Sequence, residues 1–264
     1  MADFTAKDVQ ALRQSTGAGM MDAKRALEAT GGDMEAARRW LREQGLAGAA
    51  KRAEREATQG AVALAADGGA AAIVELRCET DFVAKADDFV SLVDELASLV
   101  AAKGEGAVDE RTDAIDDLRT TLKENISVGQ VVRFVLEEGT ELGTYLHTQA
   151  GRGVNAVLVE LRSGNAELAH DLAVHIAFAR PAYLRREDVP EEEVATERET
   201  VETIARNEGK PEAALSKIVE GRMNGFFKER VLLEQPYARD EKQTISQLLG
   251  SAEVVRFAQV VVGG

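Results

Sequence analysis

The chain has 264 residues and a formal net charge of −14 at pH 7, with 45% hydrophobic but only 5% aromatic residues. A chain of this length can bury more than one hydrophobic core, and its apolar runs are too short to cross a membrane. It has one cysteine and an N-terminal stretch without an apolar signal core, which predicts a soluble cytoplasmic protein without a disulfide framework. Residues 1–60 are nearly neutral, so the remainder is strongly acidic, which favours protein partners over direct contact with nucleic acid.

Residues 1–45 are predicted to form a compact module of three short helices. Apolar residues recur there at helical spacing and are interrupted at glycine-containing turns. Met20 and Met21 follow one of these turns, where a flexible thioether suits contact with a partner; filling the core is the equally open alternative. Residues 46–59 are rich in Ala, Lys, Arg and Glu, which predicts a polar connecting helix.

Residues 60–140 are predicted to form a first sheet-and-helix subdomain. An alternating, branched strand, AAIVELRC, leads through the segment TDFVAK (80–85) into an amphipathic helix. Thr80 is the expected N-cap of that helix, with Asp81 stabilised in its first turn. Phe82 stands at a position where small polar residues are usual. We interpret it as an exposed probe that enters another protein, and the alternative is that its ring folds back into the core.

The strand and helix of this subdomain occur a second time. The segment Ile73–Arg77 (IVELR) recurs as Leu158–Arg162 (LVELR) at an offset of 85, whereas the following helices align at an offset of 79. The first copy therefore carries about six extra residues, the difference between these offsets, and they are TDFVAK. The second copy turns with Ser163–Asn165, which is ordinary turn chemistry. The fold itself thus does not require a phenylalanine at this turn.

A second core subdomain is predicted to comprise residues 141–186 and 229–264, and its helix ends before Pro181. The whole chain is therefore expected to be α+β, with the two related sheet-and-helix subdomains following the N-terminal helices.

Residues 187–228 differ in character from the rest of the chain. Glutamates favour the start of a helix, and Gly209–Pro211 reverses the chain into a second helix. This predicts an antiparallel helical hairpin, inserted in the second subdomain, in which Val201 and Ile204 face apolar residues of the second helix. Such a hairpin is too thin to fold alone, so it packs on the body and projects to bind a partner or a second copy of the chain.

No pattern typical of catalysis or of cofactor binding is found in the sequence. It lacks a P-loop and a GxGxxG turn, and His170 and His175 are five residues apart, not at the four-residue spacing that converges on zinc. Cys78 has acidic neighbours that raise a thiol pKa, which favours a buried structural thiol over a nucleophile. We therefore predict no catalytic residue, no metal and no cofactor, and the chain is expected not to be an enzyme.

Four motifs in order along the chain point to one family: TGAGMMDAKRAL, then ETDFVAK, then YLH with GRGVNAVLVEL, then KIVEGRMNGFF with LLEQPY. In this order and at these intervals they resemble bacterial elongation factor Ts. The resemblance implies a ubiquitin-associated-like domain over 1–45, two related core subdomains, and a coiled-coil or dimerisation module over 187–228.

The resemblance also implies a function, guanine-nucleotide exchange on elongation factor Tu, the GTPase that delivers aminoacyl-tRNA to ribosomes. Both the GDP-bound and the nucleotide-free forms are then partners. In this family the TDFV segment enters the GTPase near its magnesium site. That role falls here to Thr80, Asp81, Phe82 and Val83, with Asp81 and Phe82 as the leading pair.

Further contacts are implied at other positions. The N-terminal module is expected to hold the nucleotide-binding domain of the GTPase through residues matching Leu12, Met20 and Met21. Ile126 and His147 match additional contact positions, although GRGVN after His147 departs from the GRIGV common in the family. The alternative function is a binding module without exchange activity, which holds a helix or a nascent chain through the N-terminal domain. Association of two copies through the helical hairpin is left open.

Overall fold

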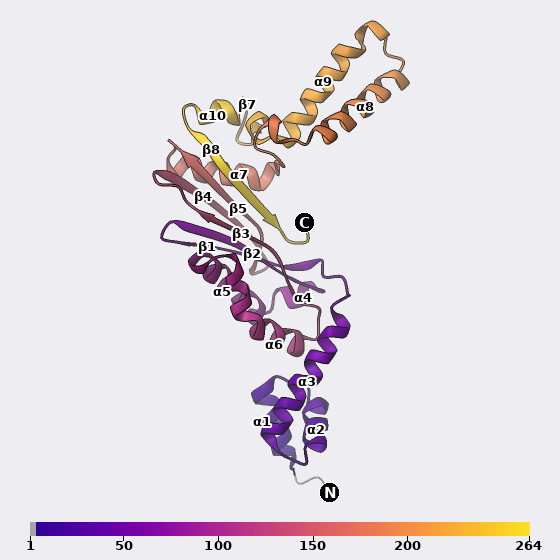
Figure 1. The fold of residues 1–264 in the computed structure, drawn as a ribbon, viewed down its shortest axis with the longest axis vertical. Helices are drawn as coiled ribbons and strands as arrows, with labels where there is room; N and C mark the ends of the chain where they lie inside the picture. Colours follow the sequence, from indigo (N-terminus) through magenta and orange to yellow (C-terminus); the bar gives the residue numbers. More distant parts are fainter. Residues whose placement is uncertain (1–3) are drawn as a thin grey trace. The chain divides into compact units, whose positions relative to one another are not determined.

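The computed structural model describes residues 4–264, which pack as two compact units. The first unit runs to Val135 and also contains Leu146–Asn155 and Val260–Gly264, and the second contains Leu136–Tyr145 and Ala156–Gln259. Helices and small sheets follow one another along the chain in an α+β arrangement (Figure 1). In the part of the chain that the structure describes, no helix is both long enough and apolar enough to span a bilayer.

Three helices lead the first unit: α1 (Ala6–Thr16), α2 (Met20–Ala29) and α3 (Met34–Arg52). Thr5 caps α1 in a reciprocal arrangement with Asp8, and Asp33 caps α3 by accepting two backbone N–H bonds. The apolar faces of the three helices meet in a small core of Val9, Leu12, Ala23, Ala26, Leu27, Ala37 and Leu41.

The third helix does not end near residue 45, where a separate connecting helix was expected to begin. Instead, α3 continues through Gly45 and Gly48 to Arg52. Glycine in a helix costs about 1 kcal/mol relative to alanine. A Cβ on Gly45 would lie 2.3 Å from Thr120 Cγ2, so glycine is the residue that lets α3 pack closely on α6 (Thr112–Leu122). Tertiary packing thus keeps the helix continuous.

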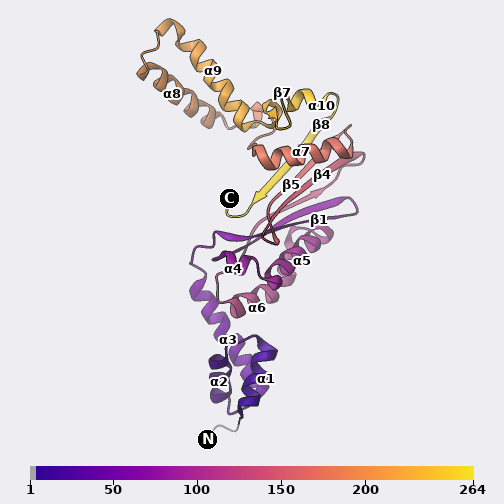
Figure 2. The ribbon, with the colours of Figure 1, turned by 180° about the vertical axis from the view of Figure 1, so that it is seen from behind.

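The first sheet has the strand order β1-β2-β3, from β1 (Gln59–Asp67), β2 (Ala70–Cys78) and β3 (Ser127–Val135). Its strands are antiparallel, with Gln59 opposite Cys78 at one end of the β1–β2 hairpin and Asp67 opposite Ala70 at the other. The amphipathic helix α5 (Asp87–Lys103) packs on β1 and β2 (Figure 2). A 3₁₀ helix, η1 (Glu105–Arg111), connects α5 to α6.

The second unit contains most of the sheet β4-β5-β8, from β4 (Thr140–Gln149), β5 (Arg152–Arg162) and β8 (Glu253–Val261). Helix α7 (Ala166–Ala179) follows β5, as α5 follows β2 in the first copy of the repeat. The hydrophobic core of the second unit is formed by residues that include Val157, Leu172 and Leu232. The smaller elements are η2 (Arg186–Asp188), η3 (Leu232–Glu234), β6 (Pro236–Tyr237), β7 (Asp240–Thr244) and α10 (Ile245–Leu249).

Both copies of the repeat bury the glutamate of their shared VELR sequence. Glu75 and Glu160 have no exposed side-chain surface. Glu75 accepts a backbone N–H bond from Gln130 at 3.1 Å and pairs with Arg77 at 2.9 Å. Glu160 is bonded in the same manner, by the backbone N–H of Glu137 at 2.7 Å and by the Arg256 guanidinium at 2.8 Å. Each copy of the repeat therefore contains a buried glutamate carboxylate that is hydrogen-bonded to a neighbouring segment.

Helices α8 (Glu191–Asn207) and α9 (Glu212–Arg230) pack against each other, joined through Gly209 with φ of 72° (Figure 1). Val201 is buried between them, but Ile204 is 43% exposed, so the expectation that Ile204 faces the second helix is wrong. Ala205, which is fully buried, takes that place on α8. The second helix also extends two residues beyond the expected end at 228.

Candidate partner-binding site

The segment 80–85 forms a helix of its own, ahead of the longer helix that the sequence predicts. Thr80 is the N-cap of α4 (Asp81–Ala84), with extended backbone angles of φ −122° and ψ 153° and a hydroxyl that accepts from the Val83 N–H at 3.4 Å. Helix α5 begins separately after Ala86. The extra residues of the first repeat are therefore a single capped helical turn between β2 and α5.

Phe82 is the most exposed of the large apolar side chains in the described residues, at 83%. Its neighbours are anchored, because Ala84 is fully buried and Val83 packs on the core of the first unit. The alternative in which Phe82 folds back into the core is therefore wrong. The turn holds an unshielded aromatic ring on a fixed base.

Asp81 directly precedes Phe82 on the same helical turn, and its carboxylate is ionised at neutral pH. Its carboxylate is bound by Lys85 Nζ at 2.5 Å, one helical turn further on, and is 46% exposed. The hydrogen bond from Lys85 is the main cause that lowers the pKa of Asp81, and the charge of Arg152 acts in the same direction. The turn thus presents an apolar ring next to a negative charge that is partly neutralised from within the chain.

Glu124, a residue distant from the turn in the chain, holds it by hydrogen bonds. Sequence analysis did not single out this residue. Its carboxylate accepts the backbone N–H groups of Glu79 and Thr80, each at 3.0 Å, and the Thr80 hydroxyl at 2.5 Å. These are charge-assisted bonds, which are stronger than bonds between neutral groups. Glu124 is 44 residues from Thr80 in the chain, and no local pattern signals the contact.

Cys78 lies directly beneath the turn and is buried, as predicted. Its Sγ–H donates to the Thr80 carbonyl at 3.2 Å. Burial, followed by the negative charge of Glu124, raises the pKa of the thiol to about 12, and the charge of Asp81 acts in the same direction. A thiol with this pKa stays protonated at neutral pH and is a poor nucleophile.

In the N-terminal module, Met20 and Met21 are 50% and 64% exposed. Neither fills the core, so that alternative is wrong for both. They line a shallow apolar groove together with Phe4, Val9 and Lys24. Leu12, in contrast, is fully buried and offers no side-chain surface to a partner.

The two additional candidate residues lie in different surroundings. Ile126 is fully buried in the core of the first unit, so its side chain does not reach the surface. His147 lies on β4 and is exposed. The structure therefore brings Thr80–Val83 together on one turn and leaves Ile126 in a supporting position beneath the surface.

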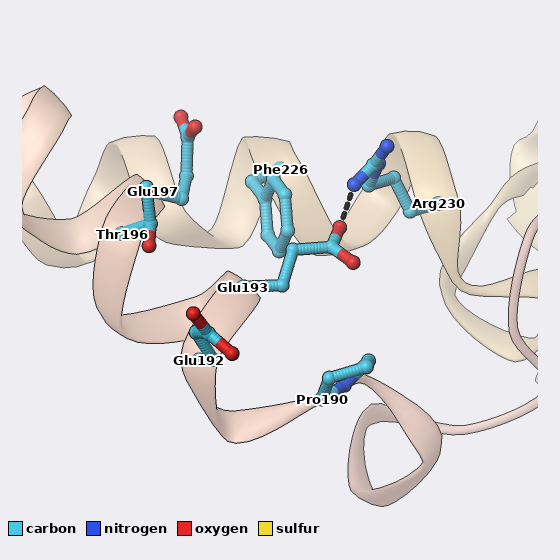
Figure 3. Close-up of a pocket in the computed structure, with 7 residues that line it drawn as sticks. All are labelled: Pro190, Glu192, Glu193, Thr196, Glu197, Phe226 and Arg230. Atoms are coloured by element: carbon cyan, nitrogen blue, oxygen red, sulfur yellow. Dashed lines mark ion pairs between the residues drawn. The ribbon is translucent and has the colours of Figure 1, made fainter.

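A separate hollow lies at the base of the helical hairpin in the second unit (Figure 3). Glu193 forms an ion pair with Arg230 there and accepts from the Tyr183 hydroxyl at 2.7 Å, while the Arg230 guanidinium lies 5.2 Å from the centre of the Phe226 ring. The ion pair links α8 to α9. Among the described residues, no group of three or more His, Cys, Asp or Glu side chains is arranged to hold a metal ion.

Comparison with known proteins identifies the family. The family model described as "Elongation factor TS" matches residues 79–264. Relatives named elongation factor Ts include that of Kineococcus radiotolerans, 46% identical over the whole of both chains, and that of Clavibacter michiganensis subsp. michiganensis, 45% identical over the whole of both. That of Acidothermus cellulolyticus is 46% identical over all of this chain and 99% of the relative.

These matches define the chain as an elongation factor of protein biosynthesis. It belongs to the elongation factor Ts family.

Proposed function

We propose that this chain is a guanine-nucleotide exchange factor for elongation factor Tu and that it promotes GDP release by inserting the Thr80–Val83 turn near the magnesium and phosphate site of the GTPase. Family membership supports the partner and the activity. The observation that carries the role of this turn is the 83% exposure of Phe82 on a capped helical turn that buried Ala84 and half-buried Val83 anchor to the core.

The exchange step needs no chemistry by this chain. GDP is held in such GTPases by backbone amides of a phosphate loop and by a magnesium ion that bridges to phosphate. A rigid wedge stabilises a GTPase conformation in which those contacts are strained. The Asp81 carboxylate adds a negative charge beside Phe82, which repels phosphate and attracts magnesium away from it.

The exposed surface of Phe82 sets an upper limit on the free energy that burying the ring can contribute to the complex. Fully burying a phenylalanine stabilises a complex by up to about 3 kcal/mol, so burying the exposed 83% contributes about 2.5 kcal/mol. If all of this free energy opposes nucleotide binding, GDP release is accelerated about 70-fold, at about 1.36 kcal/mol for each factor of ten. A larger acceleration draws on the rest of the interface. Coupling is reciprocal, so nucleotide weakens binding of the exchange factor by the same factor, and GTP can displace it.

The N-terminal residues are proposed to form a ubiquitin-associated-like domain, over 1–45, that holds the nucleotide-binding domain of the GTPase. The exposure of Met20 and Met21 beside an apolar groove supports this assignment, because thioethers adapt to a partner surface. Leu12 supports that surface from inside the module. Exposed His147 is a further candidate contact, whereas Ile126 acts through the core.

The remaining regions complete the proposed organisation. Residues 46–59 connect the N-terminal domain to core subdomains over 60–140 and over 141–186 with 229–264. The hairpin over 187–228 is proposed as a module through which two copies associate. The exposed Ile204 provides an apolar contact for that association.

The test is release of a fluorescent GDP analogue from purified elongation factor Tu. The wild-type chain is expected to accelerate release, and Phe82→Ala to lose up to about 70-fold of that acceleration. Phe178→Ala is a matched control, because Phe178 is 79% exposed but lies on α7 in the second unit. Equal rates for wild type and Phe82→Ala would contradict the wedge.

A second candidate function is a binding module that acts through the groove at Met20 and Met21 without exchange activity. The exposure of both methionines favours this candidate. It predicts that Met20→Ser with Met21→Ser abolishes binding while Phe82→Ala has no effect. The exchange proposal predicts that the methionine variant binds more weakly but retains the maximal release rate at saturation.

A further inference from the structure

The three residues that follow α6 each bond to a different part of the first unit. Lys123 Nζ lies 2.7 Å from the carboxylate of Asp22, on the first turn of α2 beside Met20 and Met21. Lys123 itself has a φ of 59°, in the left-handed region that is unfavourable for a residue with a Cβ. This conformation ends α6 and turns the chain toward β3.

Glu124, the next residue, holds the turn that bears Phe82. The Thr80 hydroxyl has one hydrogen and donates it to Glu124 at 2.5 Å, so its lone pairs are left to accept the Val83 N–H that starts α4. The same carboxylate accepts the backbone N–H groups of the two residues that follow β2. Glu124 therefore orients the cap of α4 as well as the chain entering it.

Asn125 completes the connections. Its side-chain amide donates to the carbonyls of Ala53 and Arg55 at 3.2 and 2.7 Å, just beyond the end of α3. Its backbone N–H donates to the Glu79 carboxylate at 2.7 Å. The segment thus joins α2, the end of α3 and the Phe82 turn, all within the first unit.

We infer that Lys123–Asn125 is a positioning segment, which holds the Phe82 turn and the methionine groove at a fixed separation so that both engage the same GTPase together. The inference rests on the exchange function proposed above. A probe held rigidly loses little conformational freedom when it binds, so more of its burial energy opposes nucleotide binding. A mobile turn would still bind, but it would distort the GTPase less.

The variant that tests this is Glu124→Ala, which removes all three bonds to the turn. Asp117→Ala is the matched control, because Asp117 is an exposed carboxylate on α6 itself. Two quantities are measured for each variant: the maximal rate of fluorescent GDP release at saturating exchange factor, and the hydrogen-exchange protection of the Glu79 and Thr80 amides.

In Glu124→Ala the maximal rate is expected to fall about tenfold or more, which corresponds to about 1.4 kcal/mol. Protection of the two amides is expected to be lost while the amides of β1 and β2 keep theirs. Glu124→Gln retains one acceptor oxygen and is expected to give an intermediate rate, an outcome that a simple loss of folded protein does not produce. Asp117→Ala should match wild type in both measurements.

The inference is overturned if Glu124→Ala keeps both amides protected, because Glu124 then does not hold the turn. It is also overturned if protection is lost but the release rate is unchanged, because order in the turn is then unnecessary. Failure of the proposed function has a different signature, in which wild type itself leaves GDP release unchanged, and the positioning role falls with it.

Discussion

Replacing Glu160 with glutamine removes a negative charge from a site with no exposed side-chain surface while preserving the side-chain volume. One carboxylate oxygen accepts from the Glu137 N–H and the Thr140 hydroxyl, both at 2.7 Å, and the other accepts from Arg256 Nε at 2.8 Å. A glutamine amide has only one acceptor oxygen. Whichever way it turns, its NH₂ group faces a donor, and at least one of these part-buried donors loses its acceptor.

The size of the effect follows from these contacts. A charge-assisted bond contributes about 1.5–3 kcal/mol, and an unsatisfied buried donor costs about 1–3 kcal/mol. Arg256 is 40% exposed, so its guanidinium regains solvation when the carboxylate charge is lost, which places the total near the low end, at about 3 kcal/mol. For a chain of roughly this size, about 2–4 °C is lost per kcal/mol. We therefore expect Tm to fall by about 6–12 °C.

The pH dependence has a definite sign. Burial raises the pKa of Glu160, but the hydrogen bonds from Thr140, the Glu137 amide and Arg256 together lower it below its ordinary value. The carboxylate therefore stabilises the fold fully above its unfolded pKa of about 4.3, and this contribution is lost as pH falls through the lower folded pKa. The glutamine variant has no such contribution, so the Tm difference between wild type and Glu160→Gln should shrink in acid.

Thermal unfolding followed by circular dichroism at pH 7 and at steps that continue well below the unfolded pKa of about 4.3 measures both effects. Glu253→Gln is the control, because Glu253 also pairs with arginines but is 52% exposed, and such pairs contribute about 1 kcal/mol or less. A Tm change no larger than that of the control, or a difference that widens in acid, would refute the assignment of Glu160 as a buried fastening carboxylate.

Two other predictions concern the first unit. Gly45→Val should weaken the packing of α3 on α6 by about 1–3 kcal/mol, because its Cβ would lie 2.3 Å from Thr120, whereas Gly48→Val meets only the flexible end of Arg52. Hydrogen exchange of α3 measures this, and equal protection in both variants would contradict it. Cys78, with its pKa raised to about 12 by burial, should resist a thiol reagent in native protein at pH 8 and react after denaturation. Rapid labelling of Cys78 in the native protein would contradict a buried thiol with a raised pKa.

Much of the fold is predictable because the internal repeat and the amphipathic spacing carry it. The two strand-and-helix copies have the same order in sequence and in structure, and α7 ends at Ala179, two residues before Pro181. The continuity of α3 was missed, because Gly45 looks like a break in a single sequence. Its role depends on Thr120, which lies on another helix. The exposure of Ile204 was missed because Ala205, a small residue with a weak apolar signal, takes the buried position.

The residues of the candidate site likewise differ in whether the sequence reveals them. Phe82 could be found because the second copy of the repeat has nothing in its place. Glu124 could not, because it lies in a short polar connector between α6 and β3 that resembles ordinary turn chemistry. Its partners are backbone N–H groups 44 and 45 residues away, and backbone donors leave no mark on a sequence pattern. Polar residues that follow a helix end are therefore worth examining as clamps for distant turns.

Comparison of the two copies shows what the Phe82 turn costs the fold. In the second copy, Asn165 caps α7 by accepting the Leu168 N–H at 2.9 Å, and no distant carboxylate is needed. The first copy orders about six extra residues, at about 1–2 kcal/mol of backbone entropy each, and places Phe82 in solvent. The bonds from Glu124 offset only part of that cost. Because the simpler turn serves the same fold in the second copy, stability does not account for the insertion, which supports the proposal that this turn contacts a partner.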